Sequence, residues 1–430
     1  MRVLVVGSGG REHALAWALA RSPLVDEVVA APGNPGIEAV GVCVPVDVED
    51  AAAVAKVADE VDAELTVVGP EVPLVAGAVD AIEARGRLAF GPRAAGAQLE
   101  GSKKWMKEVL GAAGVPTAQH ASFTAGNEAD ALAFLETLPG LYVVKTDGLA
   151  AGKGVVVTES LPEARDAVRA YLSGSAFGDA GRTLVIEEGL TGPELSLLAF
   201  SDGRGAEPLA PAQDFKRIGD GDAGPNTGGM GAYSPVPAAG RDVVATVIDR
   251  AMIPTLRELQ RRGVDYRGVL YAGLMLTPAG VKVLEYNVRF GDPECQVVVP
   301  RLAGDLAEHC LAVARGSLLP ARFSGDACVT VALASEGYPA TTRTGDVIEG
   351  VDDAARVPGV LIFHAGTKRV DGELVTAGGR VLNVTATAPN LADARARAYE
   401  AVAKISWPGV QYRRDIAARP TTGGDVASGQ

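Results

Sequence analysis

The sequence has few residues of the kinds that build disulfide frameworks and metal clusters. Only four of the 430 residues are cysteine and four are histidine, and no C-x-x-C or H-x-x-x-H spacing occurs. Neither a disulfide framework nor a zinc site is therefore expected. Each cysteine is interpreted as a small, buried apolar residue.

Long hydrophobic runs are also missing. No stretch approaches the roughly 20 apolar residues that a membrane helix needs. The opening residues, MRVLVVGSGG, predict a strand and a turn rather than a signal peptide. We expect a cytoplasmic protein without a membrane partner.

Runs of positive charge are absent as well. The chain carries 40 Lys and Arg against 53 Asp and Glu, a net charge of -13, and both signs are mixed along its length. Nucleic acid binding needs a basic patch, so nucleic acid is not an expected partner. The 47% apolar content indicates an ordinary globular protein, long enough for about two to four domains. A monomer is the expected state.

The N-terminal part of the chain alternates β-branched runs with helical patterns, which predicts a parallel sheet wrapped by helices. Helices are expected to begin near Arg11 and to span about residues 75–85. The chain is therefore assigned to the α/β class, with an N-terminal domain at residues 1–101. The expected strands lie at residues 3–6, 27–30, 65–68 and 88–90.

Three further regions are expected after this domain. A central domain is assigned to residues 102–325, with a compact αβ unit at about 117–190. Its segment 213–235 is rich in Gly, Asp and Asn, and irregular loops of that length are usually functional or disordered. Later strands predict a mixed, β-rich C-terminal domain at residues 326–418. Residues 419–430 are expected to form a disordered tail.

A glycine-rich stretch, KTDGLAAGKGVVV, joins two of the β-branched runs. Gly148, Gly152 and Gly154 allow backbone N–H groups to approach a ligand closely. Lys145 and Lys153 supply positive charge for phosphate oxygens. A Walker A loop is excluded, because that motif requires Ser or Thr after the lysine and is followed by a helix. We interpret the stretch as a hairpin that covers a nucleotide, with a solvated hairpin as the alternative.

The stretch LEYNVRF alternates polar and apolar residues with a period of two. On a strand, Glu285, Asn287 and Arg289 would share one face. A carboxylate and an amide oxygen two residues apart suit Mg²⁺ or Mn²⁺. Arg289 would neutralise a phosphoryl group or clamp a carboxylate. The alternative is a strand with one solvated polar face.

The first loop, GSGGREH, resembles part of a dinucleotide fingerprint. The third glycine of that fingerprint is replaced by Glu12, which disfavours a nicotinamide-dependent oxidoreductase. A helix that starts near Arg11 would still present free N–H groups and a positive dipole to a smaller anion.

Several blocks in one order resemble the ATP-grasp superfamily and, within it, the phosphoribosylamine–glycine ligase (glycinamide ribonucleotide synthetase) family of purine biosynthesis. The resemblance extends to about residue 417. It implies that the region 102–325 is the ATP-grasp domain, with a flap subdomain at about 117–190, and that the domain at 1–101 binds substrate. The blocks are GSGGREHALA, APGNPG, VGPEVPL, LEGSK, KTDGLAAGKGV, GPNTGGMGAYSP, YAGLM and YNVRFGDPE.

The resemblance also implies roles in binding ATP. Lys103 and Lys145 would contact phosphates, although Lys107 lies one helical turn from Lys103 and is an open alternative. Glu187 and its hinge segment would read adenine, and Glu194 would bind the ribose. Glu285 and Asn287 would hold Mg²⁺ or Mn²⁺. The implied nucleotide-binding residues are Lys103, Lys145, Gly152, Lys153, Gly154, Glu187, Leu190 and Glu194.

The implied reaction joins glycine to 5-phosphoribosylamine. ATP would phosphorylate the glycine carboxylate to glycyl phosphate, and the amine would then displace phosphate, giving glycinamide ribonucleotide, ADP and phosphate. Arg289, Lys216 and Asp214 are the expected catalytic residues. The residues expected to bind the substrates are Gly9, Gly10, Asn34, Glu71, Asp214 and Arg289.

One departure from the superfamily concerns the metal. Many members carry a further metal-binding acid on the preceding strand, where YAGLM has none, so a second magnesium would need other ligands. Other readings are an ATP-grasp purine enzyme that acts on formate or bicarbonate, an oxidoreductase, and a nucleotide-binding module without catalysis. ADP release that depends on glycine would separate them.

Overall fold

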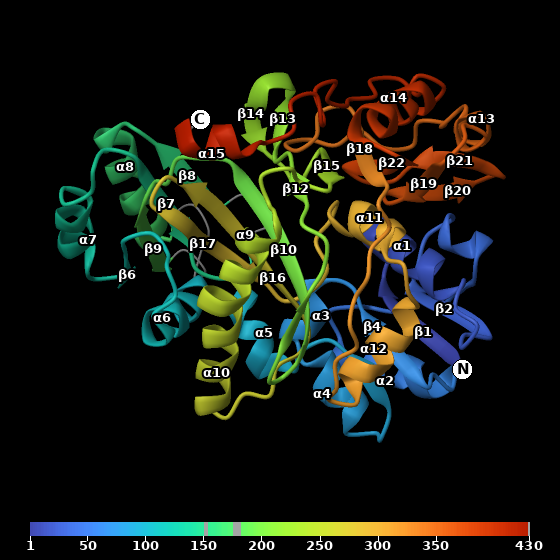
Figure 1. The fold of residues 1–430 in the computed structure, drawn as a ribbon, viewed down its shortest axis with the longest axis horizontal. Helices are drawn as coiled ribbons and strands as arrows, with labels where there is room; N and C mark the ends of the chain where they lie inside the picture. The colour runs from blue at the N-terminus through green and yellow to red at the C-terminus, as the bar shows by residue number, and fades with distance from the viewer. Residues whose placement is uncertain (150–153, 175–181, 429–430) are drawn as a thin grey trace.

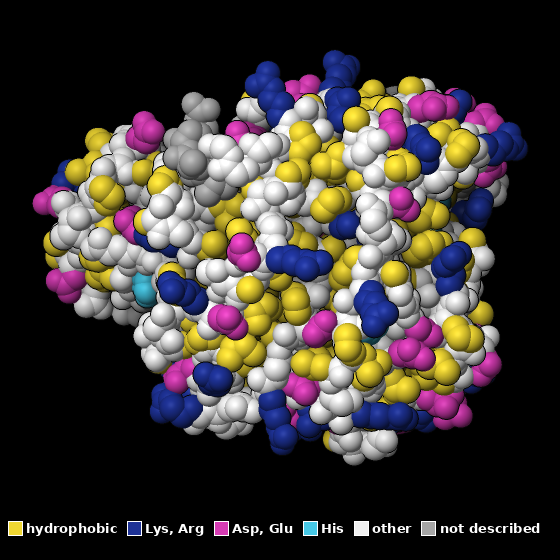
Figure 2. All heavy atoms as spheres, viewed as in Figure 1, with side chains coloured by type: hydrophobic (Ala, Val, Ile, Leu, Met, Phe, Trp, Pro, Cys, Tyr) yellow, Lys and Arg dark blue, Asp and Glu magenta, His cyan; other side chains and the backbone are white. Residues whose placement is uncertain are grey.

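The computed structural model describes residues 1–149, 154–174 and 182–428 (Figure 1). The N-terminal region lies at the lower right of that view, the C-terminal region above it, and the segment around α7 and α8 at the far left. Among the described helices, none combines the length and apolar character that crossing a bilayer requires. On the face drawn in Figure 2, acidic and basic side chains are interspersed rather than gathered by sign.

A parallel five-stranded sheet forms the N-terminal region, in the order β3-β2-β1-β4-β5. The central strand β1 is apolar and buried on both faces, as parallel strands covered by helices are. The helix expected over 75–85 is divided, because Gly77 adopts a left-handed φ of 89° between α3 and α4. The elements are β1 (Arg2–Gly7), α1 (Gly10–Leu19), β2 (Glu27–Pro32), β3 (Val42–Cys43), α2 (Ala51–Glu60), β4 (Leu65–Val68), α3 (Glu71–Val75), α4 (Ala78–Glu83), β5 (Leu88–Phe90) and α5 (Ala94–Gly101).

A second, antiparallel sheet carries the glycine-rich hairpin, in the order β6-β9-β7-β8. It follows α6 (Lys103–Ala113), which Ser102 caps and Gly114 ends with a φ of 66°. Apolar residues of α7 and α8 pack on the sheet and form a small core of their own. The elements are β6 (His120–Thr124), α7 (Glu128–Leu135), β7 (Tyr142–Thr146), β8 (Val155–Thr158), α8 (Leu161–Leu172) and β9 (Thr183–Glu188).

The third sheet is antiparallel, in the order β11-β10-β16-β17, and contains the predicted metal-binding strand. A β-bulge shifts the pairing of β16 and β17 between Gly273 and Leu274. The elements are β10 (Glu194–Asp202), β11 (Ala206–Pro208), α9 (Arg241–Val247), a π-helical turn (Ile248–Met252), α10 (Ile253–Arg261), β16 (Arg267–Thr277), β17 (Gly280–Asn287), α11 (Cys295–Val298) and α12 (Leu306–Ala314).

The fourth sheet, in the order β12-β15-β18-β22-β19, corrects the expectation of an irregular loop over 213–235. That segment contributes β12 and β15 to this sheet, with a hairpin of β13 and β14 between them. The elements are β12 (Gln213–Asp214), β13 (Arg217–Gly219), β14 (Ala223–Asn226), β15 (Gly231–Ser234), β18 (Ala327–Ala334), α13 (Val351–Ala355), β19 (Val360–His364), β20 (Thr367–Val370), β21 (Glu373–Thr376), β22 (Arg380–Ala388) and α14 (Leu391–Val402).

The segment expected to be a disordered tail contains a helix, α15 (Gly423–Ser428). Thr421 anchors it, because its backbone N–H donates to the Tyr233 hydroxyl and its own hydroxyl donates to Gln213. Ala238 N–H donates to the Thr421 carbonyl. Three hydrogen bonds to distant residues therefore hold Thr421, near the start of the segment, in a position that its polar composition did not indicate.

Candidate functional site

The predicted metal ligands lie on one face of the third sheet. Glu285 pairs with Gly273 of β16, and Asn287 pairs with Tyr271, so both side chains leave the sheet on the same side. Strand β17 ends at Asn287, earlier than the alternation of LEYNVRF predicts. Arg289 nevertheless stays beside the strand, because its Nη2 donates to Asn287 Oδ1 over 3.1 Å.

The Glu285 carboxylate makes no hydrogen bond or ion pair with the residues that the structure describes, although cations surround it. Burial raises its pKa, but Lys216, Lys145 and Lys103 outweigh that effect and hold the pKa below its ordinary value. An unpaired carboxylate beside an amide oxygen fits a hard cation such as Mg²⁺. The facing residue of β16 is Gly273, which offers no ligand, and no group of three or more His, Cys, Asp or Glu gathers elsewhere in the described ranges.

Lys103 and Lys107 lie on the same helix but in different surroundings. Lys103 Nζ donates to the Gly148 carbonyl over 2.9 Å, at the base of the glycine-rich hairpin. Burial lowers its pKa. Lys107 is only 1% exposed and donates to Thr117 Oγ1 over 2.7 Å and to Glu187 Oε2 over 3.0 Å. Lys107 therefore has buried partners for its ammonium group, whereas Lys103 is partly exposed at the base of the hairpin.

Glu187 lies between two ammonium groups. Its carboxylate is 3.0 Å from Lys107 Nζ and 2.9 Å from Lys145 Nζ, and the residue is 2% exposed. Burial raises the pKa of Glu187, but the two lysines outweigh it and lower the pKa overall. The Glu187 carboxylate therefore pairs with two lysines, whereas the sequence predicted that it contacts adenine. The main chain of Leu190, by contrast, forms no hydrogen bond with the described residues.

The base of the glycine-rich hairpin is joined to the start of α6. Thr146 N–H donates to the Gly154 carbonyl over 2.9 Å. Asp147 accepts from Ser102 Oγ over 3.1 Å and from Lys104 N–H over 3.2 Å. Sequence reasoning missed Asp147, although it belongs to the KTD motif. Two predicted residues, Gly152 and Lys153, lie outside the described residues.

Lys216 brings the predicted catalytic and ribose-binding residues together. Its ammonium pairs with Glu194 and, over 3.4 Å, with Asp214 Oδ1. Burial raises the pKa of Asp214 to about 7; Lys216 opposes this shift, while Glu294 and Glu194 add to it. The two acids beside Lys216 raise its pKa well above the ordinary value, despite burial. Glu194 begins β10, Asp214 ends β12, and Lys216 follows β12 by two residues.

Arg289 links the metal-binding face to the N-terminal domain. Its Nη2 donates to Glu100 Oε1 over 2.6 Å, and its Nε donates to Glu71 over 3.3 Å. Glu100 also accepts from Val288 N–H over 2.9 Å. Burial raises the pKa of Glu100. Glu100 was not predicted, although it lies in the LEGSK block, because the sequence did not reveal its distant partner Arg289.

The first loop folds back on itself. Glu12 caps α1, since its Oε2 accepts from Gly9 N–H over 2.6 Å, so the residue that replaces the third glycine closes the loop. Asn34 is committed in a similar way: its amide donates to the Ser8 and His364 carbonyls, and its oxygen accepts from two backbone N–H groups. Asn34 therefore shapes the loop, which differs from the substrate contact predicted for it.

Gly10 lies at a close approach of two domains. A Cβ atom at Gly10 would lie 2.3 Å from Asn383 Nδ2 and 2.8 Å from Gln296 Nε2. Asn383 belongs to β22 of the C-terminal sheet, so the first helix packs directly against the last domain. Sequence reasoning chose Gly10 for its access to a ligand, whereas the structure gives it a packing role.

A buried acid next to the site was also missed. Glu294 Oε1 accepts from the Tyr271 hydroxyl over 2.5 Å and from Ser196 Oγ over 3.0 Å. Tyr271 and Ser196 lie on neighbouring strands of the third sheet. The FGDPE block contained Glu294, but its alternation gave no signal for a contact with β10.

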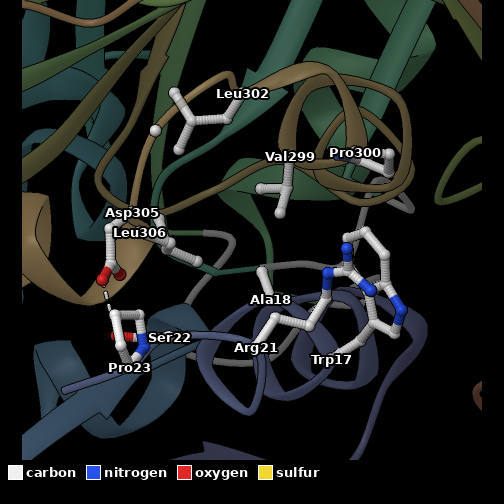
Figure 3. Close-up of a pocket in the computed structure, with 11 residues that line it drawn as sticks. Trp17, Ala18, Arg21, Ser22, Pro23, Val299, Pro300, Leu302, Asp305 and Leu306 are labelled. Carbon is white, nitrogen blue, oxygen red and sulfur yellow. Dashed lines mark hydrogen bonds between the residues drawn. The ribbon is translucent and has the colours of Figure 1, made fainter. Parts of the chain in front are cut away.

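A separate hollow of about 590 Å³ lies between α1 and the segment 299–306 (Figure 3). The Arg21 guanidinium lies 5.0 Å from the Trp17 ring centre on one side of it, and Ser22 donates to Asp305 over 2.6 Å. None of the predicted site residues lines this hollow.

Comparison with known proteins gives three consecutive family matches along the chain. The phosphoribosylglycinamide synthetase N domain matches residues 1–100, its ATP-grasp (A) domain matches 101–295, and its C domain matches 328–419.

Whole-chain relatives agree with these matches. The chain is 50% identical to a phosphoribosylamine–glycine ligase of Streptomyces coelicolor, covering 97% of this chain and 99% of the relative. A protein of the same name from Brucella melitensis is 49% identical, covering 97% and 98%. The crystal structure of the Thermotoga maritima phosphoribosylamine–glycine ligase superposes with a TM-score of 0.84 at 35% identity, covering 97% and 100%. A biotin carboxylase from Campylobacter jejuni, at 14% identity and a TM-score of 0.73 over 99% and 98% of the chains, shares the fold.

Proposed function

Since the chain belongs to the phosphoribosylglycinamide synthetase family, it ligates glycine to 5-phosphoribosylamine in an ATP-dependent step of purine biosynthesis, and we propose how its residues carry out that reaction. The observation that carries the proposal is the Glu285 carboxylate, which has no partner among the described residues and has three lysines and Arg289 around it. Such a cluster suits a reaction in which charged phosphate is transferred.

The reaction proceeds in two steps. A carboxylate oxygen of glycine attacks the γ-phosphorus of ATP, the bond to the β-γ bridging oxygen breaks, and glycyl phosphate and ADP form. The amine of 5-phosphoribosylamine then attacks the carbonyl carbon of glycyl phosphate. The carbon–oxygen bond to phosphate breaks, the nitrogen loses a proton, and glycinamide ribonucleotide and phosphate are released. Phosphorylation is needed because a free carboxylate is a poor electrophile.

Lys103 and Lys145 bind the phosphates of ATP in this mechanism. Both ammonium groups lie near Glu285, and Glu187 orients Lys145 through a 2.9 Å ion pair. Fixed positive charges stabilise the negative charge on the phosphoryl group in the transition state, and they need not rearrange during the reaction. The main chain of Leu190, which forms no hydrogen bond with the described residues, supports a contact with adenine.

The family also implies a divalent cation, and the chain offers suitable donors for it. Glu285 and Asn287 would hold Mg²⁺ or Mn²⁺, which when bound supplies Lewis-acid polarisation of phosphate oxygens. Arg289 holds Asn287 Oδ1 in place and is itself held by Glu100.

Asp214 and Lys216 bind glycine in this proposal. A zwitterionic amino acid needs one anionic and one cationic partner, and these two side chains supply both next to the nucleotide-binding Glu194. Lys216 would donate to the glycine carboxylate, and Asp214 would accept from the glycine ammonium group. The Arg289–Glu71 pair would lie on the side of 5-phosphoribosylamine, because Glu71 belongs to the N-terminal domain.

A coupled ADP assay tests this function. Purified protein is supplied with ATP, a magnesium salt, glycine and freshly made 5-phosphoribosylamine, and each component is omitted in turn. We expect ADP release to require glycine and glycinamide ribonucleotide to form only in the complete mixture. Equal ADP release with formate or bicarbonate in place of glycine would instead indicate a different carboxylate substrate.

A further inference from the structure

Arg413, near the C-terminus, contacts the segment that carries Asp214 and Lys216. Its guanidinium carbon is 4.8 Å from the centre of the Phe215 ring, the residue between Asp214 and Lys216. Its Nη1 donates to the Arg217 carbonyl over 3.2 Å, just after Lys216. One buried cation therefore touches the short segment that carries both side chains.

Arg413 is itself held in a fixed position. It is 1% exposed, and Asp415 binds it in a bidentate manner with distances of 2.7 Å and 2.6 Å. Its Nη1 also donates to Asp222 Oδ1 over 2.6 Å. Burial lowers the pKa of Arg413, but Asp415 and Asp222 outweigh that effect. The planar guanidinium thus has its donors fixed on three sides, which an ammonium group cannot reproduce.

The main chain of the same segment is held from its other side. Thr227 donates to the Lys216 carbonyl twice, from its N–H over 2.7 Å and from its hydroxyl over 2.8 Å. Met230 N–H donates to the Phe215 carbonyl over 2.7 Å. With the Arg217 carbonyl on Arg413, three consecutive carbonyls have defined partners. The Lys216 side chain is the part of the segment that projects toward Glu194.

We propose that Arg413 is a positioning residue for glycine ligation. It holds Asp214 and Lys216 at the glycine site by packing on the Phe215 ring and by donating a hydrogen bond to the Arg217 carbonyl. This inference rests on the glycine-binding role proposed above for those two residues. The C-terminal segment then takes part in the chemistry of the ATP-grasp domain without contacting a substrate. A misplacement of about 1 Å in a catalytic group costs about 100-fold in rate.

The test compares Arg413→Met with Arg413→Lys and with a matched control, Arg395→Met. Arg395 also lies over a ring, 4.7 Å from the centre of Tyr399, and donates to the Ile416 and Arg414 carbonyls. It supports the same C-terminal segment but makes no contact with the segment at 214–217 among the described interactions. Thermal unfolding, kcat and KM for glycine, and the Kd for ADP are measured for each full-length variant.

We expect Arg413→Met to lower kcat/KM for glycine by about 100-fold, while its Kd for ADP stays near the wild-type value. Arg413→Lys should recover part of the loss, because the charge over Phe215 remains. Arg395→Met should keep wild-type glycine kinetics even if its melting temperature falls as far. An equal loss of glycine use in Arg395→Met, or an equal loss of ADP affinity in Arg413→Met, would overturn the inference.

A second variant keeps the test decisive if Arg413→Met does not fold. Phe215→Leu leaves every ion pair of Arg413 in place and removes only the ring. The inference predicts the same selective loss of glycine use, and wild-type glycine kinetics in a folded Phe215→Leu would contradict it. If the wild-type protein itself shows no glycine-dependent ADP release, the proposed function fails and this inference fails with it.

Discussion

Single residues in the site fall into two groups according to their partners. Lys107 and Glu187 are buried and paired with each other, so their charges are compensated inside the protein. Glu285 has no partner among the described residues, although cations hold its pKa low. Local alternation predicted the position of Glu285. The Lys107–Glu187 pair could not be predicted, because its members are 80 positions apart in the sequence.

Glu285→Ala should abolish ligation and leave the fold intact. The carboxylate has no hydrogen bond or ion pair to lose with the described residues, whereas removing a preorganised electrostatic group costs about 10²–10³-fold in rate. Glycine-dependent ADP release and far-ultraviolet circular dichroism would be measured. Glu373→Ala, an exposed acid on β21, is the control. Undiminished turnover in Glu285→Ala would remove the metal assignment.

Lys103→Met and Lys107→Met should fail in different ways. Lys103 is placed to contact phosphate, so its loss should raise KM for ATP by about tenfold with little change in melting temperature. Lys107 neutralises the buried Glu187, and breaking a buried ion pair costs about 3–5 kcal/mol of unfolding free energy. Equilibrium unfolding in urea and ATP titrations would separate the two. The reverse pattern would transfer the phosphate contact to Lys107.

The pH dependence of glycine use should follow Asp214. Burial raises its pKa to about 7, and the deprotonated form, which predominates above that pH, is the one that binds an ammonium group. The value of kcat/KM for glycine should therefore fall about tenfold for each pH unit below 7 and level off above it. Asp214→Asn should remove this inflection along with most of the activity. An unchanged inflection in that variant would assign the titration to another group.

Secondary structure elements set the site through their register and turns. The parallel sheet, the β7–β8 hairpin and the strand that carries Glu285 and Asn287 were all predicted from residue patterns, because each pattern is local. The strands β12 and β15 were not predicted, since β15 pairs with β18 of the C-terminal domain and the segment that contains both strands is rich in residues that favour turns. Tertiary pairing outweighed local propensity there.

Gly192→Ala tests the turn that leads from the hinge segment into β10. Gly192 has a φ of 140°, and a Cβ atom there would lie 2.2 Å from the Leu276 carbonyl oxygen. We expect the free energy of unfolding to fall by about 2–4 kcal/mol, because backbone strain and a main-chain overlap combine. Gly240→Ala is the matched control, since its Cβ would meet no atom within 4 Å. Equal unfolding midpoints in urea would contradict the expected strain.

At the scale of the whole molecule, the C-terminal sheet makes direct contacts with the central domain. Arg380 of β22 donates to the carbonyls of Gly228, Gly229 and Asp292. It thereby joins the C-terminal sheet to the connection between β14 and β15 and to the FGDPE block. Such contacts between distant segments carry no periodic signal in the sequence. For that reason domains could be proposed from the sequence, whereas the contacts between them could not.

Removal of residues 419–430 should destabilise the protein. The truncation deletes Thr421, which makes hydrogen bonds to Tyr233, Gln213 and Ala238. Each such bond contributes about 0.5–1.5 kcal/mol net, so a loss of about 2–4 kcal/mol is expected. Differential scanning calorimetry would measure it, with Thr422→Ala as a control that keeps Thr421. A truncated protein with the wild-type melting temperature would restore the expectation of a disordered tail.

The pairing of β15 with β18 has a consequence for the order in which the protein folds during synthesis. Strand β15 (Gly231–Ser234) pairs on one side with β18 (Ala327–Ala334), which is synthesised almost a hundred residues later. A nascent chain that already contains Lys103, Lys145 and Glu285 still lacks β18 and Arg413, which hold the neighbourhood of Lys216 in the finished fold. If Lys216 binds glycine as proposed, the glycine site is completed only after the residues proposed to bind ATP have been synthesised.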